Sequence, residues 1–335
     1  MDEIKPQNRI SLIIMEGWPV LLLASFLGFA SYGVKVVTGS NFADPLFIAL
    51  LLGILARVII LRNKTQMLTH GFSLALVILI PIGTVLYGAI NLNFVNLAKI
   101  DSRVFVIMVA TLLAYFVVIL LLGKLLNQRE KTTYLIATGS AVCGASAIAI
   151  TAPAIDAEPN DVSVGLISVF IAGVFGLFIF LPFLINLFEI NDQVYAILSG
   201  TTLQFTGFVK TSVGGLSKDA ISIALATKAT RYMALFLIIP IFSSMVKRKF
   251  HTPWFLWAFL AAGLVFSFVP KISETLTPVL KPILDILWSI AMAAIGLNAD
   301  IRMLISDNGL KALLMAFVGF FVAVAVSLTG LMILF

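Results

Sequence analysis

The chain has 335 residues, of which 61% are hydrophobic and only 11% are charged, and its formal net charge is +6. Soluble domains carry about 25% charged residues, so this composition excludes an ordinary soluble protein. The apolar runs continue for about 18 residues or more, which is typical of membrane-spanning helices and not of the alternating strands of a β-barrel. The positive charge lies in loops between these runs and does not indicate a nucleic-acid partner.

The apolar runs predict an all-α integral membrane protein with about eleven transmembrane helices in a single domain over residues 1–335. An extra helix at about 10–37 precedes two sets of five, which cover about 45–189 and 193–334. A shift of five spans reverses the side on which a set begins, so the two sets are candidates for an inverted repeat. The predicted spans are 10–37, 45–62, 67–92, 102–124, 132–155, 160–189, 193–213, 218–246, 253–270, 276–298 and 309–334.

The loops between alternate spans differ in positive charge, which predicts the orientation of the chain in the membrane. If the N-terminus is inside, the loop at 39–44 is outside and lacks Lys and Arg, and the acidic loop at 156–161 is also outside. An odd number of spans then places the C-terminus outside. The inside charges are Lys5, Arg9, Arg62, Lys64, Lys124, Arg129, Lys131, Lys247, Arg248 and Lys249; the exceptions are Lys99, Lys218 and Lys271.

The predicted span at 132–155 is interrupted at its centre by small and polar residues. Its two glycines weaken a helix by about 1 kcal/mol each relative to Ala, and they allow other groups to approach closely. Irregular backbone at membrane depth persists only inside protein or beside a wet cavity. This run therefore predicts a broken helix that lines a polar substrate site near the membrane centre. Its candidate substrate-binding residues are Gly139, Ser140, Cys143, Gly144 and Ser146.

A second stretch, at 199–207, has the same character, because glycines bound a hydroxyl-rich segment between apolar runs. Two interrupted hydrophobic segments in one membrane chain indicate a transporter binding site, whereas close helix packing by small residues is the alternative for each. Thr201, Thr202 and Gln204 are the candidate ligands here. The partner of the first stretch stays open, since counting five spans matches it with 291–297 and local similarity matches it with 199–207.

Lys228 and Arg231 lie three residues apart in one predicted span and so share a helix face. Ionisable groups inside a membrane are costly and are functional candidates by default. With no acid in their own segment, the pair predicts an anion site; ion pairs with Asp219 or Asp285, or extension toward the headgroups, are the alternatives. Asp285 is also a candidate coupling acid. Lys210 stays open between cavity and interface, and two further candidate ligand-binding residues beside small-residue turns are Tyr87 and Asn298.

Enzyme and cofactor motifs are missing from the sequence. It has no metal-binding His-Glu-x-x-His, no phosphate-binding loop and no nucleophile elbow. The sequence therefore predicts neither an enzyme nor a metal or other cofactor, and any transport would draw on an ion gradient or on the gradient of the substrate.

Several segments resemble the YeiH family of bacterial membrane proteins, also called sulfate exporters, in order along nearly the whole chain. The resemblance implies a multi-pass protein of the inner membrane, with inverted repeats and crossing broken helices as in cation/proton antiporters and bile-acid transporters. It also implies a small anionic substrate, sulfate or an organosulfonate. One departure is that Gln204 and Phe205 stand where the family usually has His-Glu, which excludes proton coupling through those positions. The matching segments are 139–149, 86–88, 200–203, 228–231 and 292–297.

The leading interpretation is a secondary active transporter of a small anion that works by alternating access. One alternative is a sodium- or proton-coupled carrier of another small solute, such as an organic acid, with Asp285 as the coupling acid. Another is a non-transporting membrane sensor whose small residues only pack helices. The expected partners are the substrate, the lipid bilayer and a coupling ion, H⁺ or Na⁺; a homodimer is left open.

Overall fold

The structure is a computed structural model that describes residues 6–39, 44–60, 78–92, 94–97, 100–250, 252–299, 302 and 305–335, and every regular element in them is helical. Six helical stretches are long and apolar enough to cross a membrane. They are α1 (Pro6–Thr38), α6 (Ser102–Leu125), α9 (Pro159–Phe175) continued through a π-helical turn by α10 (Leu181–Phe188), α13 (Lys218–Thr230) with α14 (Met233–Lys247), α16 (Pro270–Asn298) and α18 (Asp307–Leu334).

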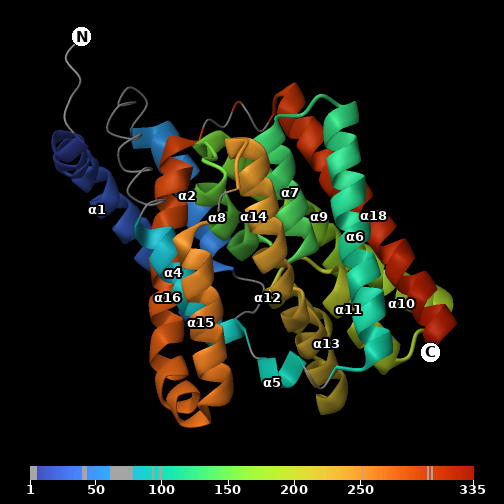
Figure 1. The fold of residues 1–335 in the computed structure, drawn as a ribbon. Coiled ribbons are helices and arrows are strands. Elements are labelled where there is room, and N and C mark those ends of the chain that lie inside the picture. The colour runs from blue at the N-terminus through green and yellow to red at the C-terminus, as the bar shows by residue number, and fades with distance from the viewer. Residues whose placement is uncertain are drawn as a thin grey trace.

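The helices form two bundles that lie side by side (Figure 1). In the first bundle, α16 packs against α1, α2 and α4, and α15 packs against α4. In the second, α18 packs against α6 and α9, and α13 lies beside α11. The shorter elements of the first bundle are α2 (Pro45–Ile60), α4 (Ile80–Asn91) and α15 (Trp254–Phe268), and the short α5 (Phe94–Leu97) leads into α6.

The first predicted broken helix is confirmed as broken, but it does not cross the molecule. It consists of α7 (Glu130–Ala141) and α8 (Ala145–Ala154), whose lengths of about 18 and 15 Å each span roughly half of a membrane core of about 30 Å. Arg129, just before α7, pairs with Glu158, just after α8, at 2.7 Å. Both ends therefore lie on one side, and we call this element hairpin 1 (129–158).

The second broken helix also folds back. It consists of α11 (Asp192–Thr202) and α12 (Thr206–Ser212), with extended backbone at Leu203 and Phe205 between them. The first turn of α11 and the last turn of α12 line one small cavity, so the two ends of this element are neighbours. We call it hairpin 2 (191–213).

The two hairpins enter from opposite ends of the molecule. The open end of hairpin 1 adjoins the end of α14, where Lys247 lies 3.7 Å from Asp156, and the start of α18, where Gln128 donates to the Asn308 carbonyl. The open end of hairpin 2 lies at the end of α10 and the start of α13, near the C-terminus (Figure 1). The eleven-crossing prediction is therefore wrong for these two segments, because each of them turns back halfway.

One loop placement changes as a consequence. The acidic loop at 156–161 was predicted to lie on the other side from Arg129 and Lys131, but it pairs with both, since Lys131 donates to the Asp156 carbonyl at 2.6 Å. That prediction is wrong. The predicted placement of the two termini relative to the membrane stays a prediction.

The tenth predicted span is a continuous helix, α16, so the match of its segment 291–297 with the broken 132–155 is wrong. Its small residues serve helix packing instead. A Cβ on Gly296 would overlap the Leu50 carbonyl of α2, and one on Gly53 would overlap the Ala293 carbonyl of α16. Of the sequence predictions, the part of the third span before residue 78, the side chain of Arg9, and Lys5, Arg62, Lys64 and Lys99 lie outside the description.

Candidate functional site

The tips of the two hairpins touch at the centre of the second bundle. Gly144 begins α8 with a φ of +67°, a conformation that side chains other than glycine rarely adopt. A Cβ at this position would also lie 2.7 Å from the ring of Phe205, at the tip of hairpin 2. The glycine that breaks the first helix therefore provides both the turn and the close approach of the tips.

Lys228 joins the two tips. Its side chain is fully buried, and its Nζ donates to the carbonyls of Val142 in hairpin 1 and of Leu203 and Gln204 in hairpin 2, at 2.6–2.7 Å. An ammonium group has three N–H donors, so these three bonds use all of them.

Arg231 repeats the arrangement one helical turn further along. Its Nε donates to the Ala141 carbonyl at 2.7 Å and one terminal nitrogen to the Ser140 carbonyl at 2.7 Å. The other terminal nitrogen donates to the carbonyls of Leu203 at 2.8 Å and Gly200 at 3.2 Å. This side chain is also fully buried.

The hydrogen bonds of the two cations therefore all go to the protein backbone. Their partners are carbonyls at the C-terminal ends of α7 and α11, where a helix carries about half a negative charge. No carboxylate among the described residues pairs with either cation: Asp285 binds Lys35 instead. Direct coordination of a substrate anion by Lys228 is excluded in this arrangement, because no N–H group of its ammonium is left over.

The other predicted residues at the tips are also buried. Tyr115 donates to the Thr202 carbonyl at 2.7 Å, and the Thr201 hydroxyl lies 2.7 Å from that of Ser327 in α18. Gln204 contacts the Tyr115 hydroxyl through Nε2 at 3.5 Å. Gly139 faces Ile148, where a Cβ would be 2.7 Å away, so this glycine lets α8 pack closely against α7. These groups hold the hairpins in the bundle.

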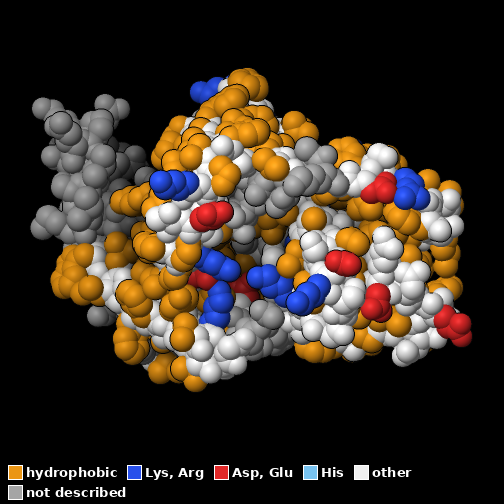
Figure 2. Space-filling model, turned by 90° about the horizontal axis from the view of Figure 1, so that it is seen from below, with side chains coloured by type: hydrophobic (Ala, Val, Ile, Leu, Met, Phe, Trp, Pro, Cys, Tyr) orange, Lys and Arg blue, Asp and Glu red, His pale blue; other side chains and the backbone are white. Residues whose placement is uncertain are grey.

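A cavity of about 230 Å³ lies on the seam between the two bundles, at the level of the hairpin tips. Seen from the end of the molecule that carries the C-terminus, Lys and Arg side chains gather around a hollow that also exposes acidic groups (Figure 2). The first bundle contributes Lys35, Asp44, Pro45, Leu46, Tyr87, Ile90, Asn91, Lys281, Leu284, Asp285 and Trp288; the hairpins contribute Cys143, Ser146, Thr206, Gly207 and Lys210.

The charged groups of this cavity come from both bundles. Lys35 of α1 pairs with Asp285 of α16 at 2.5 Å. Among the described residues neither Lys210 nor Lys281 has an ion pair or hydrogen bond, so these two ammonium groups are available to a ligand. Asp44 accepts from the N–H groups that begin α2, at 2.8 and 3.2 Å, and burial raises the pKa of its carboxyl.

Only some of the sequence-predicted site residues meet in the cavity. They are Tyr87, Cys143, Ser146 and Asp285, together with Lys210, whose place the sequence left open. Asn298 does not join them: it lies at the other end of α16 and its Nδ2 donates to the Ala294 carbonyl of its own helix.

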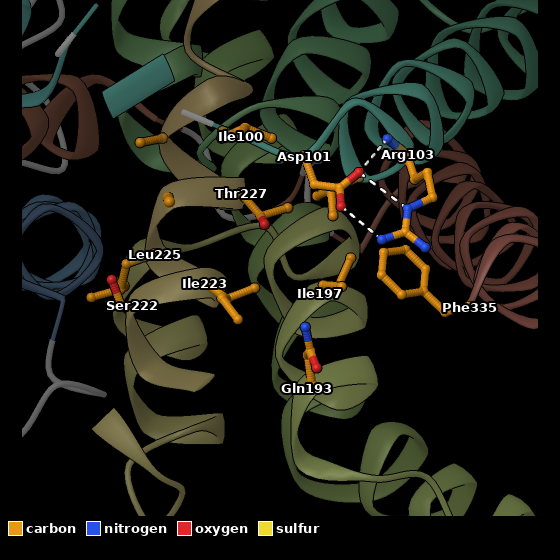
Figure 3. A pocket seen from close by; sticks show the side chains of 13 residues that line it. Ile100, Asp101, Arg103, Gln193, Ile197, Ser222, Ile223, Leu225, Thr227 and Phe335 are labelled. Atoms are coloured by element: carbon orange, nitrogen blue, oxygen red, sulfur yellow. Dashed lines mark hydrogen bonds and ion pairs between the residues drawn. The ribbon is translucent and has the colours of Figure 1, made fainter. Parts of the chain in front are cut away.

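A larger cavity, of about 600 Å³, lies near the C-terminus between α6, α11 and α13 (Figure 3). Most of its lining is apolar, as the labelled side chains of Ile197, Ile223 and Leu225 show. Its charged groups satisfy each other, because Arg103 pairs with Asp101 at 2.9 Å and lies over the ring of Phe335. This lining offers little to a small ion.

Comparison with known proteins shows which family the chain belongs to. The family described as Conserved hypothetical protein 698 matches residues 19–316. The chain belongs to this family. The UPF0324 inner membrane protein YeiH of Salmonella typhimurium is 30% identical over 334 residues, 94% of this chain and 93% of the relative. The expected membership of the YeiH family is thus confirmed.

Other UPF0324 relatives span a wide range of organisms. The UPF0324 membrane protein of Archaeoglobus fulgidus is 27% identical over 309 residues, 91% of this chain and 90% of the relative. The UPF0324 inner membrane protein YeiH of Escherichia coli is 29% identical over 315 residues, 89% and 88% of the two chains. No solved structure matches the chain.

The departure from the YeiH pattern falls at the tip of hairpin 2. Gln204 and Phe205 stand there in place of the expected His-Glu, and both side chains are buried. Phe205 packs on Gly144, and Gln204 packs on Gly173, where a Cβ would be 2.8 Å from its Oε1. Titration at these two positions is therefore replaced by packing between the tips and α9.

Among the cavity residues that sequence reasoning missed are Lys35, Asp44, Thr206, Lys281 and Trp288. Lys281 had a usable signal, because it stands four residues before Asp285 in an apolar helix and so shares its face. Lys35 stands near the end of α1, where a lysine ordinarily extends to the headgroups. Only the packing of α1 against α16 shows its partner.

Proposed function

We propose that the protein is a secondary active transporter of a small anion in the bacterial inner membrane. The observation that carries this proposal is the cavity on the seam, where Lys210 of hairpin 2 and Lys281 of α16 face the same space and form no ion pair with any residue that the structure describes. Ion sites of transporters lie near the membrane centre beside interrupted helices. The hairpin tips supply such a place, and the relatives named inner membrane proteins support the location.

Charge favours an anion in this cavity. Three lysines line it against two aspartates, which leaves one positive charge in excess. Behind its wall, Lys228 and Arg231 add two positive charges, whereas the two helix C-termini that they contact contribute about one negative charge in total. Both sets of charges raise the local potential, and the low dielectric of a membrane protein strengthens their effect.

Alternating access is supported by the way the two halves of the chain pack. Each half, 45–189 and 193–334, supplies one hairpin and helices to both bundles. The contacts are reciprocal: α2 packs on α16 as α4 packs on α15, α7 on α9 as α11 on α13, and α6 on α18. We take this as an inverted repeat whose elements are circularly permuted between the halves. The hairpin is the first element of the second half and the fourth element of the first half.

The orientation that fits the charges has the N-terminus inside. The open end of hairpin 1 gathers Lys124, Arg129, Lys131 and Lys247 with the acidic loop, and positive charge favours the cytoplasmic side. At the other end of the molecule, Lys and Arg side chains surround a hollow (Figure 2), and we take this hollow as the mouth of the cavity. The structure therefore represents an outward-open state under this proposal.

The test is uptake of labelled anions into proteoliposomes, with sulfate and short organosulfonates as the first probes. We expect Lys210→Ala and Lys281→Ala each to weaken anion binding about tenfold or more, since a hydrogen bond to a charged group is worth about 1.5–3 kcal/mol. Lys218→Ala, an exposed change in the same half of the chain, is the matched control. Lack of anion uptake by the wild type, or equal uptake by all variants, would overturn the proposal.

A proton-coupled carrier of an organic acid is the second candidate, because Asp285 lines the same cavity and pairs with Lys35 across two helices. In that case Asp285→Asn removes the dependence of uptake on a pH gradient while substrate binding persists. A sensor that does not transport would bind an anion, as seen in a thermal shift, without any uptake.

A further inference from the structure

Six backbone carbonyl oxygens converge where the hairpin tips meet. They belong to Ser140, Ala141 and Val142 of hairpin 1 and to Gly200, Leu203 and Gln204 of hairpin 2. Oxygen ligands are those that hard cations prefer, and unwound backbone of this kind coordinates Na⁺ in coupled carriers. The tips thus present the donor set of a cation site at membrane depth.

In this chain the positive charge at the six carbonyls comes from two side chains. Lys228 and Arg231 come from one stretch of α13 and its end, and both are fully buried. Leu203 accepts from both of them, at 2.6 and 2.8 Å, so the two cations and the two tips form one connected network. The network satisfies carbonyls that would otherwise be buried without a partner, which is costly.

We propose that Lys228 and Arg231 are tethered counter-cations of the hairpin tips, which occupy the place of a coupling metal ion, so that the protein binds its anion without Na⁺. The part that concerns the anion rests on the proposed function. The part that concerns the tips stands without it, because it predicts how the fold itself responds to cations.

The wild-type protein supplies the first measurement. Its melting temperature, and the dissociation constant for sulfate or for the sulfonate that binds, are compared in sodium gluconate and in choline gluconate of equal ionic strength. We expect both quantities to be the same in the two salts. A tenfold tighter affinity in sodium, or a melting temperature several degrees higher in sodium, would contradict the proposal.

The second measurement removes the tethered cation and supplies a free one. Lys228→Ala leaves the carbonyls of Val142 and Gln204 without their partner, while Leu203 keeps Arg231. Its melting temperature is expected to fall by on the order of 10 °C. Propylammonium, which replaces the deleted chain and its three N–H donors, is expected to restore part of that loss as its concentration rises. Tetramethylammonium, which has no N–H group, is expected to restore none.

Lys218→Ala at the exposed start of α13 is the matched control, and propylammonium should leave its melting temperature and that of the wild type unchanged. Unchanged melting of Lys228→Ala, or equal rescue by both ammonium salts, would overturn the role of Lys228. If this variant cannot be purified in a folded form, the sodium comparison on the wild type decides. A protein that binds no anion at all would fail the proposed function yet still give the melting results.

Discussion

At the scale of residues, the lysines in this protein have two different uses that their surroundings determine. Lys228 has every N–H group bonded to carbonyls inside the bundle, whereas Lys210 and Lys281 face a cavity with no bonded partner among the described residues. A buried cation with saturated donors supports the fold, and a cation with free donors can hold a ligand. The number of hydrogen-bond acceptors around a buried lysine therefore distinguishes a structural lysine from one that can bind a ligand.

Asp44 gives a prediction about pH. Burial raises the pKa of its carboxyl above the value in the unfolded chain, so ionisation of Asp44 costs more in the folded protein than in the unfolded one. The resulting stabilisation is complete below the unfolded-state pKa of about 3.9 and is lost as pH rises through the higher folded-state value. Asp44→Asn keeps an oxygen for the N–H groups of Leu46 and Phe47 and removes the charge.

We therefore expect Asp44→Asn to raise the melting temperature by a few degrees near pH 7 and to have no effect near pH 4. Thermal melts across this pH range, with wild type and variant side by side, provide the measurement. A variant that is less stable than the wild type at pH 7 would show that the carboxylate charge is needed at the start of α2.

At the scale of elements, the hairpins depend on their breaks. Hairpin 1 turns at Gly144, with its positive φ, while hairpin 2 turns through the extended residues Leu203 and Phe205. Because Phe205 packs against Gly144, the two turns fit one another. A change at one tip is thus felt by the other.

Gly144→Ala is expected to destabilise the protein by about 2–4 kcal/mol, because it adds backbone strain of about 1–2 kcal/mol and forces a Cβ against the ring of Phe205. Gly215→Ala is the matched control, since nothing lies within 4 Å of a Cβ there. Denaturation of the purified variants measures both changes. Equal stability of the two variants would mean that the tips relax without cost.

Much of the helical layout is predictable from hydropathy, and both breaks are predictable from their glycines. The return of each hairpin is not, because two half-length helices joined by a turn have the same composition as one crossing helix. The return of hairpin 1 is shown by the ion pair of Arg129 with Glu158, which brings its two ends together. The carbonyl partners of Lys228 carry no sequence signature at all, since every residue has a carbonyl.

The composition of the cavity was predictable only in part for a similar reason. Cys143 and Ser146 follow from the first break, and Asp285 follows from the cost of an acid in an apolar helix. Lys35, Lys210 and Lys281 stand on three different helices, and only the packing of α1 and α16 beside hairpin 2 gathers them. Such a set is a property of the tertiary arrangement.

At the scale of the whole molecule, the seam and its opening give a prediction about sidedness. In a Cys143→Ala background, which removes the one cysteine, we introduce Lys281→Cys. A membrane-impermeant thiol reagent is expected to label it from the outer face of intact cells, because we take the hollow at the end that carries the C-terminus as the mouth of the cavity. Labelling only after the cells are opened would reverse the orientation.

The hydrogen bonds from α13 and its end to both hairpin tips limit how the hairpins can move. Lys228 and Arg231 each donate hydrogen bonds to both hairpin tips, so the tips cannot separate without breaking these bonds. Under the alternating access that we propose, the hairpin bundle therefore moves as one block against the wall formed by α2, α4 and α16. A bulky compound wedged into the seam would freeze that sliding even if it carried no charge, and such wedges are the inhibitors to look for.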